Sequence, residues 1–179
     1  MDSKDFSASC DKSPERILSS GIHVDQEGDW HYQEDKITRG DILELFLTNL
    51  TLTAGGTFVI HWMGQRCTIE VADTPFIVSR VDRIQLEDEK GEEILIRLKH
   101  LPDPEVLDPS TLKVEEGNVP YCSVGNGQFR AKFSRPAYYQ LTAWIEQDPD
   151  TGAFYLELNG RQYPVGTADP LKQQGAAGD

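Results

Sequence analysis

One pattern occurs twice in this chain, 96 positions apart and without a gap. The two segments are residues 36–73 and 132–169. An internal repeat limits the possible folds strongly, because each copy is a supersecondary unit that must bury its apolar face against a neighbour. The sequence therefore predicts two related units. Eight of the 38 aligned positions are identical: Lys36/Lys132, Arg39/Arg135, Leu45/Leu141, Gly56/Gly152, Phe58/Phe154, Gly64/Gly160, Ala72/Ala168 and Asp73/Asp169.

Each copy has the pattern of a helix followed by a hairpin. In the first copy, residues 39–50 place apolar side chains at helical spacing, and residues 58–71 then alternate with a period of two around Gly64. In the second copy, Ser134 is typical of a helix N-cap, and Asn159-Gly160 is the strongest short signal for a hairpin turn. The paired glycines thus match for a backbone reason, since turns favour residues that tolerate a positive φ.

The remaining segments predict one more short helix and several strands, which give an α+β fold. The extra helix begins at Ser13-Pro14 and stops at Gly21. The strands are expected at 22–24, 30–32, 76–86, 93–100, 119–124 and 128–133, with a linker at 102–109. We expect two small lobes with mixed or antiparallel sheets and one main helix per repeat. The predicted division is a polar N-terminal segment with the short helix (1–20), a first lobe (21–100), a second lobe (101–170) and a disordered tail (171–179).

Charge and hydropathy exclude several classes of partner. The chain of 179 residues carries a formal net charge of −13, and no cluster of Lys and Arg stands out. Nucleic-acid binders usually present a basic patch, so we expect no nucleic-acid partner. No apolar run approaches the ~18 residues that span a bilayer, and the N-terminus lacks the apolar core of a signal peptide. These features predict a soluble, cytoplasmic protein with no membrane partner.

The Cys, His and acidic residues show no spacing typical of a metal centre. The three cysteines lack a CxxC pair, the four histidines lack HxxxH or HExxH, and the acidic runs near 87–93 and 115–116 lack the pattern of a calcium loop. We expect no metal and no cofactor. Cys67 and His61 are a candidate thiolate–imidazole pair. However, Cys67 aligns with Tyr163 of the second copy, which favours a packing role.

Three groups of residues carry a family resemblance through their order and spacing: Gly28-Asp29-Trp30-His31-Tyr32 with Ile37 and Arg39; Val71-Ala72-Asp73-Thr74-Pro75-Phe76; and Pro120-Tyr121 with Val124, Gly127, Ala131, Arg135, Tyr138-Tyr139 and Leu141. Together they resemble a bacterial family described as domain of unknown function 1285 (DUF1285). The resemblance covers roughly residues 22–166 and implies an α+β protein with a repeated helix-and-sheet motif. It implies no established activity, and a role in signalling has been suggested for the family. The family's His-Pro-Leu element is replaced here by residues 108–112, Asp-Pro-Ser-Thr-Leu, without the histidine.

Two repeated charge pairs and a set of aromatic residues are the candidate site. Arg39 and Arg135 each fall in the first turn of a predicted helix, where a cation opposes the helix dipole. The matched Asp73 and Asp169 are their natural partners. These pairs either tie each helix to its hairpin or place two arginines where an anion binds. Trp30 and Tyr121 belong to an aromatic set that either fills the core or lines a groove.

These patterns predict a binding protein rather than an enzyme. We expect a non-enzymatic regulatory module that binds a protein or a small molecule in the cleft between the two repeats. The candidate ligand-binding residues are Trp30, Arg39, Asp73, Tyr121, Arg135 and Asp169. The alternative is a small hydrolase that uses carboxylates and arginines at the same cleft. Self-association into a homodimer through an exposed strand edge is a further possibility.

Overall fold

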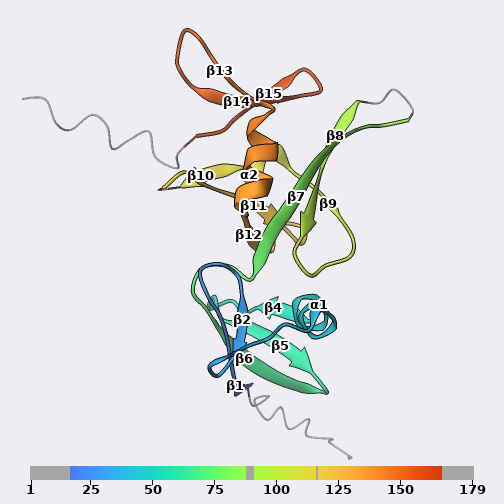
Figure 1. The fold of residues 1–179 in the computed structure, drawn as a ribbon, viewed down its shortest axis with the longest axis vertical. Coiled ribbons are helices and arrows are strands. Elements are labelled where there is room, and N and C mark those ends of the chain that lie inside the picture. The colour runs from blue at the N-terminus through green and yellow to red at the C-terminus, as the bar shows by residue number, and fades with distance from the viewer. Residues whose placement is uncertain (1–16, 88–90, 116, 167–179) are drawn as a thin grey trace, which may run out of the picture.

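The computed structural model describes residues 17–87, 91–115 and 117–166. Three sheets follow one another along the long axis of the molecule, as Figure 1 shows. We call them sheets A, B and C in chain order. Sheet A lies at one end, sheet B in the middle and the small sheet C at the other end. The architecture is α+β with mixed and antiparallel sheets, as predicted. In the described part of the chain, no helix is both long enough and apolar enough to cross a membrane.

Sheet A has six strands and carries helix α1 (Gly40–Thr48) on one face. The helix buries Leu43 and Leu47, which lie four residues apart and therefore share one stripe of its surface. The strand order is β3-β2-β1-β6-β5-β4, and β1 runs parallel to β6. The strands are β1 (Ile17–Val24), β2 (Trp30–Tyr32), β3 (Asp35–Lys36), β4 (Leu50–Leu52), β5 (Phe58–Trp62) and β6 (Gln65–Val71).

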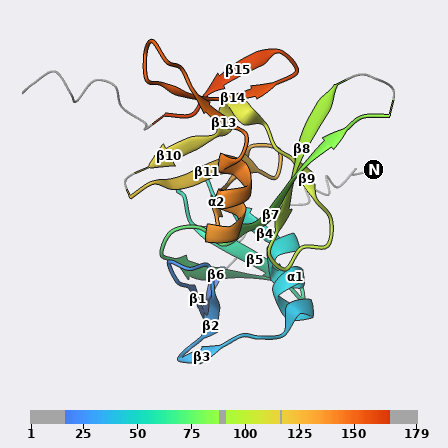
Figure 2. The ribbon, with the colours of Figure 1, turned by 45° about the horizontal axis from the view of Figure 1, so that its top comes forward.

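Sheet B also has six strands, in the order β10-β11-β12-β7-β8-β9. Its centre is a parallel pairing of β12 with β7, and helix α2 (Arg135–Thr142) packs against β7, where Gln140 accepts a hydrogen bond from the backbone N–H of Val81 at 2.9 Å. Figure 2 shows α2 leading from sheet B towards sheet C. The strands of sheet B are β7 (Phe76–Gln85), β8 (Glu92–Leu98), β9 (Glu105–Val106), β10 (Lys113–Glu115), β11 (Val119–Val124) and β12 (Phe129–Phe133), and a 3₁₀ turn, η1 (Pro109–Thr111), precedes β10. Sheet C holds β13 (Ile145–Gln147), β14 (Phe154–Leu158) and β15 (Arg161–Pro164).

The predicted hairpins are confirmed, whereas the predicted helices need correction. Helix α1 ends at Thr48 rather than at residue 50, because the chain turns directly into β4. The second helix likewise ends before Ile145, which begins β13. The short helix expected before Gly21 is wrong in its described part, since residues 17–20 belong to β1 and pair with β6. Gly21 has φ 70° inside a register shift of that strand, so it marks a bulge rather than a helix stop. Residues 1–16 and the predicted tail, 171–179, lie outside the described residues.

The order of helix and hairpin occurs twice, but in different surroundings. Helix α1 begins at Gly40 and α2 at Arg135, which are 95 positions apart. Strand β14 starts and ends 96 positions after β5, and β15 starts 96 positions after β6. Their sheets differ, because β6 pairs with both β5 and β1, whereas β15 is an edge strand that pairs with β14. Common descent of the two segments therefore stays a prediction. The sheets divide between β6 and β7, at residues 72–75, and the predicted lobe boundary after residue 100 falls inside sheet B.

Sheets A and B share one hydrophobic core. A single cluster of buried side chains includes Val24 and Ile60 from sheet A together with Val78 and Ile96 from sheet B. At the seam, the rings of Phe58 and Phe129 stack with their centroids 6.4 Å apart. The two sheets are therefore packed against each other, and side chains from both can line one site.

Candidate functional site

A cluster of polar side chains crosses the seam at Asp73, in the connection between sheets A and B. The Tyr121 hydroxyl donates to Oδ2 of Asp73 at 2.8 Å, and the Arg130 guanidinium donates to Oδ1 at 2.9 Å. The Lys132 ammonium lies 3.2 Å from Oδ2. The Asp73 side chain is 16% exposed, so these interactions are partly shielded from water. Asp73 therefore fixes the connection between the sheets onto β11 and β12.

The alternation of β11 and β12 places the partners of Asp73 on one face. Cys122 and Ala131 are buried in the core, and the two residues face each other across the ladder. Tyr121 and Lys132 form the neighbouring cross-strand pair, and side chains of successive residues point to opposite faces of a sheet. Tyr121, Arg130 and Lys132 consequently gather on the face away from Cys122.

Arg130 holds this cluster together from above the Tyr121 ring. Its guanidinium carbon lies 3.6 Å from the ring centroid, and its second terminal nitrogen donates to Glu115 at 3.0 Å. Burial raises the pKa of the Tyr121 hydroxyl, and the hydrogen bond to Asp73 raises it further. Tyr121 therefore stays protonated at neutral pH and acts as a donor. Lys132 also donates to the carbonyl oxygen of Gln26 at 2.8 Å, which adds a second link from β12 to sheet A.

A cavity of about 390 Å³, which we call the seam cavity, opens beside this cluster. Leu52 and Phe58 from sheet A line it together with Tyr121, Lys113 and Arg130 from sheet B. Arg130 is paired with two carboxylates, whereas Lys113 has no ion pair among residues 17–87, 91–115 and 117–166. The seam cavity thus combines apolar walls with the ammonium group of Lys113.

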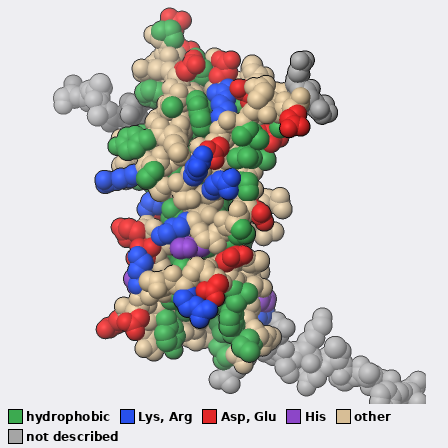
Figure 3. Space-filling view, turned by 45° about the vertical axis from the view of Figure 1, so that its right-hand side comes forward, with side chains coloured by type: hydrophobic (Ala, Val, Ile, Leu, Met, Phe, Trp, Pro, Cys, Tyr) green, Lys and Arg blue, Asp and Glu red, His purple; other side chains and the backbone are tan. Residues whose placement is uncertain are grey.

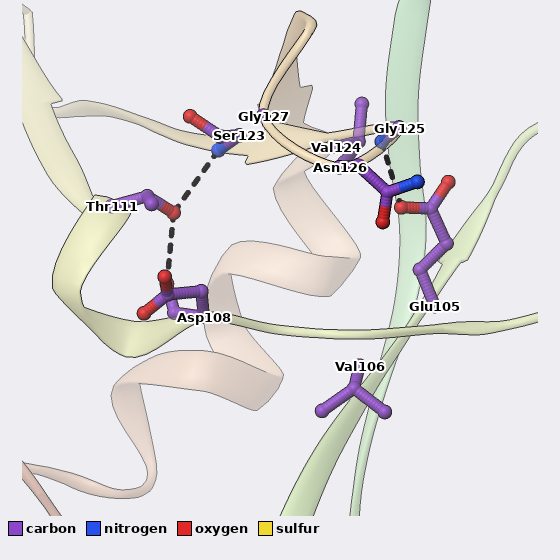
Figure 4. A pocket seen from close by; sticks show the side chains of 9 residues that line it. All are labelled: Glu105, Val106, Asp108, Thr111, Ser123, Val124, Gly125, Asn126 and Gly127. Carbon is purple, nitrogen blue, oxygen red and sulfur yellow. Dashed lines mark hydrogen bonds between the residues drawn. The ribbon is translucent and has the colours of Figure 1, made fainter.

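A second cavity of about 610 Å³, the loop cavity, lies at the other end of β11 (Figure 4). Glu105 and Asp108 stand on different segments of its wall. The Thr111 hydroxyl accepts from the Ser123 N–H at 3.1 Å and donates to the Asp108 carbonyl at 2.8 Å, which fixes η1 against β11. The Gly125 N–H donates to one oxygen of Glu105 at 2.9 Å, and Gly125 has φ 60°.

The two cavities adjoin, because Thr111, Ser123 and Gly127 line both of them. We call the combined hollow the β11 groove. One end presents the carboxylates Glu105 and Asp108, and the other end presents Lys113 beside the ion pair of Arg130 and Glu115. The groove therefore has a separation of charge along its length.

The structure brings together two of the six predicted site residues, Tyr121 and Asp73. Trp30 is 1% exposed and packs beside Phe46 in the core, so it lies away from the groove. Arg135 is exposed at the start of α2. Asp169 lies outside the described residues.

The predicted Arg39–Asp73 pair is not formed. Arg39 is an exposed N-cap residue that pairs with Asp41, two positions later, because that carboxylate is the nearest one and also offsets the helix dipole. Asp73 pairs instead with Arg130 and Lys132. These two cations were missed, although the alternation of residues 129–133 already placed both on one polar face.

The other candidate chemistries find no supporting geometry. His61 pairs in register with Arg66, and Cys67 with Ile60, so His61 and Cys67 point to opposite faces of the hairpin. His61 instead hydrogen bonds to Thr51 at 3.1 Å. In the described ranges, no three His, Cys, Asp or Glu side chains converge in a way that could hold a metal ion.

The comparisons with known proteins show similarity to two solved structures. No protein-family model matches the chain, and no curated protein does. A DUF1285 family protein from Silicibacter pomeroyi DSS-3 matches with a TM-score of 0.66 and 22% identity, over 84% of this chain and 81% of that one. A DUF1285 family protein from Shewanella baltica OS155 matches with a TM-score of 0.56 and 16% identity, over 68% of this chain and 90% of that one. The chain therefore has the fold of these DUF1285 family proteins, which confirms the predicted resemblance at the level of the fold.

Proposed function

We propose that the protein is a non-enzymatic binding module whose ligand lies in the β11 groove. The observation that carries this proposal is that the two cavities adjoin and share Thr111, Ser123 and Gly127 in their walls. Their volumes, about 610 and 390 Å³, fall in the range of small-molecule sites. The groove is also lined by both sheets, as a ligand site in the cleft between two lobes requires.

The charges of the groove favour an extended ligand with opposite charges at its two ends. One carboxylate oxygen of Glu105 is engaged by Gly125, and one of Asp108 by Ser110, so each residue keeps an oxygen for a ligand. An ammonium group suits that end. Lys113 suits a carboxylate at the other end, beside the apolar walls formed by Leu52 and Phe58. A short peptide with free termini combines these features.

The hydrolase alternative receives less support from the same residues. Both oxygens of Asp73 already accept from Tyr121, Arg130 or Lys132, so this carboxylate is poorly placed to take a proton from a water molecule. Arg130 is likewise engaged by Asp73 and Glu115. The cluster is built as a joint between the sheets, which suits a protein that responds to a ligand.

A regulatory role follows from where the ligand would sit. A molecule in the seam cavity touches Leu52 and Phe58 on sheet A and Tyr121 on sheet B, so its binding stabilises one arrangement of the two sheets. We propose that this coupling operates in the bacterial cytoplasm. We further propose that the two helix–hairpin segments are related copies, which is supported by the common offset of β5 and β14.

The test uses the residue at the neck of the groove. We expect a panel of tripeptides to raise the melting temperature of the wild-type protein, and Ser123→Trp to abolish that shift because the indole fills the neck. Ser79→Trp places the same side chain on an exposed position of β7 outside the groove and should bind like the wild type. Equal binding by both variants would place the ligand elsewhere.

A second arm tests the charge assignment. Glu105→Gln keeps an acceptor for the Gly125 N–H but removes the negative charge. We expect it to weaken binding of tripeptides with a free amino terminus about tenfold, in line with the loss of one charged hydrogen bond of ~1.5 kcal/mol. N-acetylated peptides should show no such difference between the two proteins. Calorimetric titration measures both.

A further inference from the structure

An apolar pocket of about 470 Å³ lies between α1 and sheet A, on the opposite side of the seam from the β11 groove's loop cavity. Ile42 and Phe46 of α1 form one wall, and Ile60, Trp62 and Cys67 of the β5–β6 hairpin form the other. Ile60 is 2% exposed and therefore lies at the floor, whereas Trp62 is 37% exposed at the side. We call this hollow the helix pocket. Hydrophobic side chains reach the surface at this end of the molecule in Figure 3.

The pocket forms because helix α1 packs against the core through one stripe of its surface. Leu43 and Leu47 are the buried residues of α1 and rest on the core. Ile42 and Phe46 form the adjacent stripe, four residues apart, and are only half-buried. The equivalent hairpin position to Cys67 in the second segment holds Tyr163, whose ring packs against the core. The small thiol of Cys67 thus leaves space that an aromatic ring would fill.

The described lining of the helix pocket is almost wholly apolar. Among residues 17–87, 91–115 and 117–166, no charged side chain lines the pocket. The Ser20 hydroxyl donates to the carbonyl of Thr68 at 2.6 Å and accepts from the Ile22 N–H at 3.0 Å, so it is already engaged. A charged or strongly polar occupant would lose its hydration without compensation. An apolar occupant gains from every methylene group it removes from water.

The walls are fixed before any ligand arrives. The Phe46 and Trp62 rings meet edge to face, with centroids 5.6 Å apart at 75°. Phe46 is supported from behind by the fully buried Trp30, at 5.9 Å. A preformed apolar cavity loses little free energy to reorganisation when it binds.

We propose that the helix pocket binds a neutral alkyl chain, whose polar end projects past the half-exposed Tyr32 at the rim. A cavity of about 150 Å³ already accepts a benzene-sized molecule, so the helix pocket accommodates a chain on the order of ten carbons. The described lining residues carry no charge, which favours a neutral chain over an ionic amphiphile. This site is independent of the β11 groove, and a failure of either assignment leaves the other standing.

The experiment titrates the 179-residue chain with the linear 1-alkanols from hexanol to dodecanol. Each added methylene should tighten binding about fourfold, which is ~0.8 kcal/mol per group, until the chain fills the pocket and the gain stops. The same alkanols should protect Cys67 from iodoacetamide in a Cys10→Ser background, because Cys67 lines the pocket. Affinities that do not depend on chain length, or no protection of Cys67, would overturn the proposal.

Two variants and one control locate the site. Cys67→Tyr introduces the residue of the second hairpin and should weaken decanol binding at least tenfold. Trp62→Ala removes one wall of the pocket. The Trp62 side chain is 37% exposed, so we expect the variant to fold. It should bind every alkanol in the series more weakly than the wild type. His61→Tyr adds the same ring as the first variant to the exposed face of the same hairpin and should bind like the wild type.

Light scattering on the wild-type protein with and without decanol distinguishes a competing occupant. A monomer in both conditions supports the alkyl site. A dimer that decanol dissociates would show that a second copy covers the pocket, and would overturn the assignment to a small molecule.

Discussion

At the residue scale, Asp73 and Tyr121 are the centre of the polar cluster that links sheets A and B. We call this cluster of Asp73, Tyr121, Arg130 and Lys132 the joint. The joint unites one carboxylate with a phenol, a guanidinium and an ammonium, each on a neighbouring position of β11 or β12. A partly buried carboxylate that accepts from three donors stabilises the folded state strongly. Its removal leaves all three donors without that acceptor at once. The sequence predicted Asp73 and Tyr121 as candidate site residues for separate reasons, but it did not predict that the two side chains contact each other.

Substitutions at the joint should separate its parts. Tyr121→Phe removes one hydrogen bond but keeps the ring beneath Arg130, so we expect a loss of about 1 kcal/mol in the free energy of unfolding. Asp73→Asn weakens all three interactions and should cost about 2 kcal/mol. Asp41→Asn breaks an ion pair whose carboxylate side chain is 65% exposed, so its stability should stay close to that of the wild type. Urea denaturation measures all three, and equal losses for Asp73→Asn and Asp41→Asn would contradict the special role of the joint.

At the element scale, the two helices show how far local sequence signals reach. Ser134 was predicted as the N-cap of α2, and its hydroxyl does accept from the Ala137 N–H. The hairpins were predicted correctly because alternation and the turn at Asn159-Gly160 are local signals. The strands β4 and β13 were missed because each follows its helix directly, and apolar residues at a helix end fit either period.

Long-range pairing was less accessible from the sequence than these local signals. The parallel pairing of β12 with β7 joins residues more than fifty positions apart. This pairing places the β11–β12 hairpin in the same sheet as β7. Nothing in the local pattern of residues 76–98 indicates that partner. For the same reason, the predicted site contained Asp73 but not Arg130 and Lys132, whose approach depends on this pairing.

The unequal caps of the helices lead to a prediction at this scale. Ser134→Ala removes the side-chain cap of α2 and should lower the free energy of unfolding by about 1 kcal/mol. Arg39 occupies the N-cap of α1 without a side-chain hydrogen bond to the helix. Arg39→Ala should therefore lower the free energy of unfolding by clearly less than Ser134→Ala, because water screens its exposed ion pair with Asp41. Thermal and urea unfolding of both variants check the difference, and a larger loss for Arg39→Ala would show that its pairing does more than its exposed position suggests.

At the scale of the whole molecule, three kinds of contact hold sheets A and B together. The shared core contributes apolar burial, and the joint at Asp73 contributes charged hydrogen bonds. The third contact is Asp29, in the turn between β1 and β2, which meets Lys99 just after β8 at 2.8 Å and Lys36 of β3 at 2.5 Å. Nearby, Gly28 leaves no room for a side chain, because a Cβ there would overlap Ile77. The loop that carries Asp29 is thus pressed against sheet B.

The link through Asp29 predicts how the arrangement of the sheets depends on acid. The hydrogen bond from Lys36 and then that from Lys99 hold the pKa of Asp29 below its ordinary value of 3.8, against the effect of burial. The unfolded chain therefore binds the proton more readily than the folded one. The stability that Asp29 contributes is fully present above pH 3.8 and is lost as the pH falls through the lower, folded pKa.

Asp29→Asn should consequently flatten the dependence of the unfolding free energy on pH below 4, compared with the wild type. Asp41→Asn is the matched control, because its partner Arg39 belongs to sheet A's own lobe and both side chains are exposed. Urea denaturation between pH 6 and pH 3 gives the slopes. Small-angle scattering over the same range adds a readout specific to the sheets, since protonation of Asp29 removes a link between them while each sheet keeps its own ladder. A wild-type slope in Asp29→Asn would mean that the core and the Asp73 joint hold the sheets together without this ion pair.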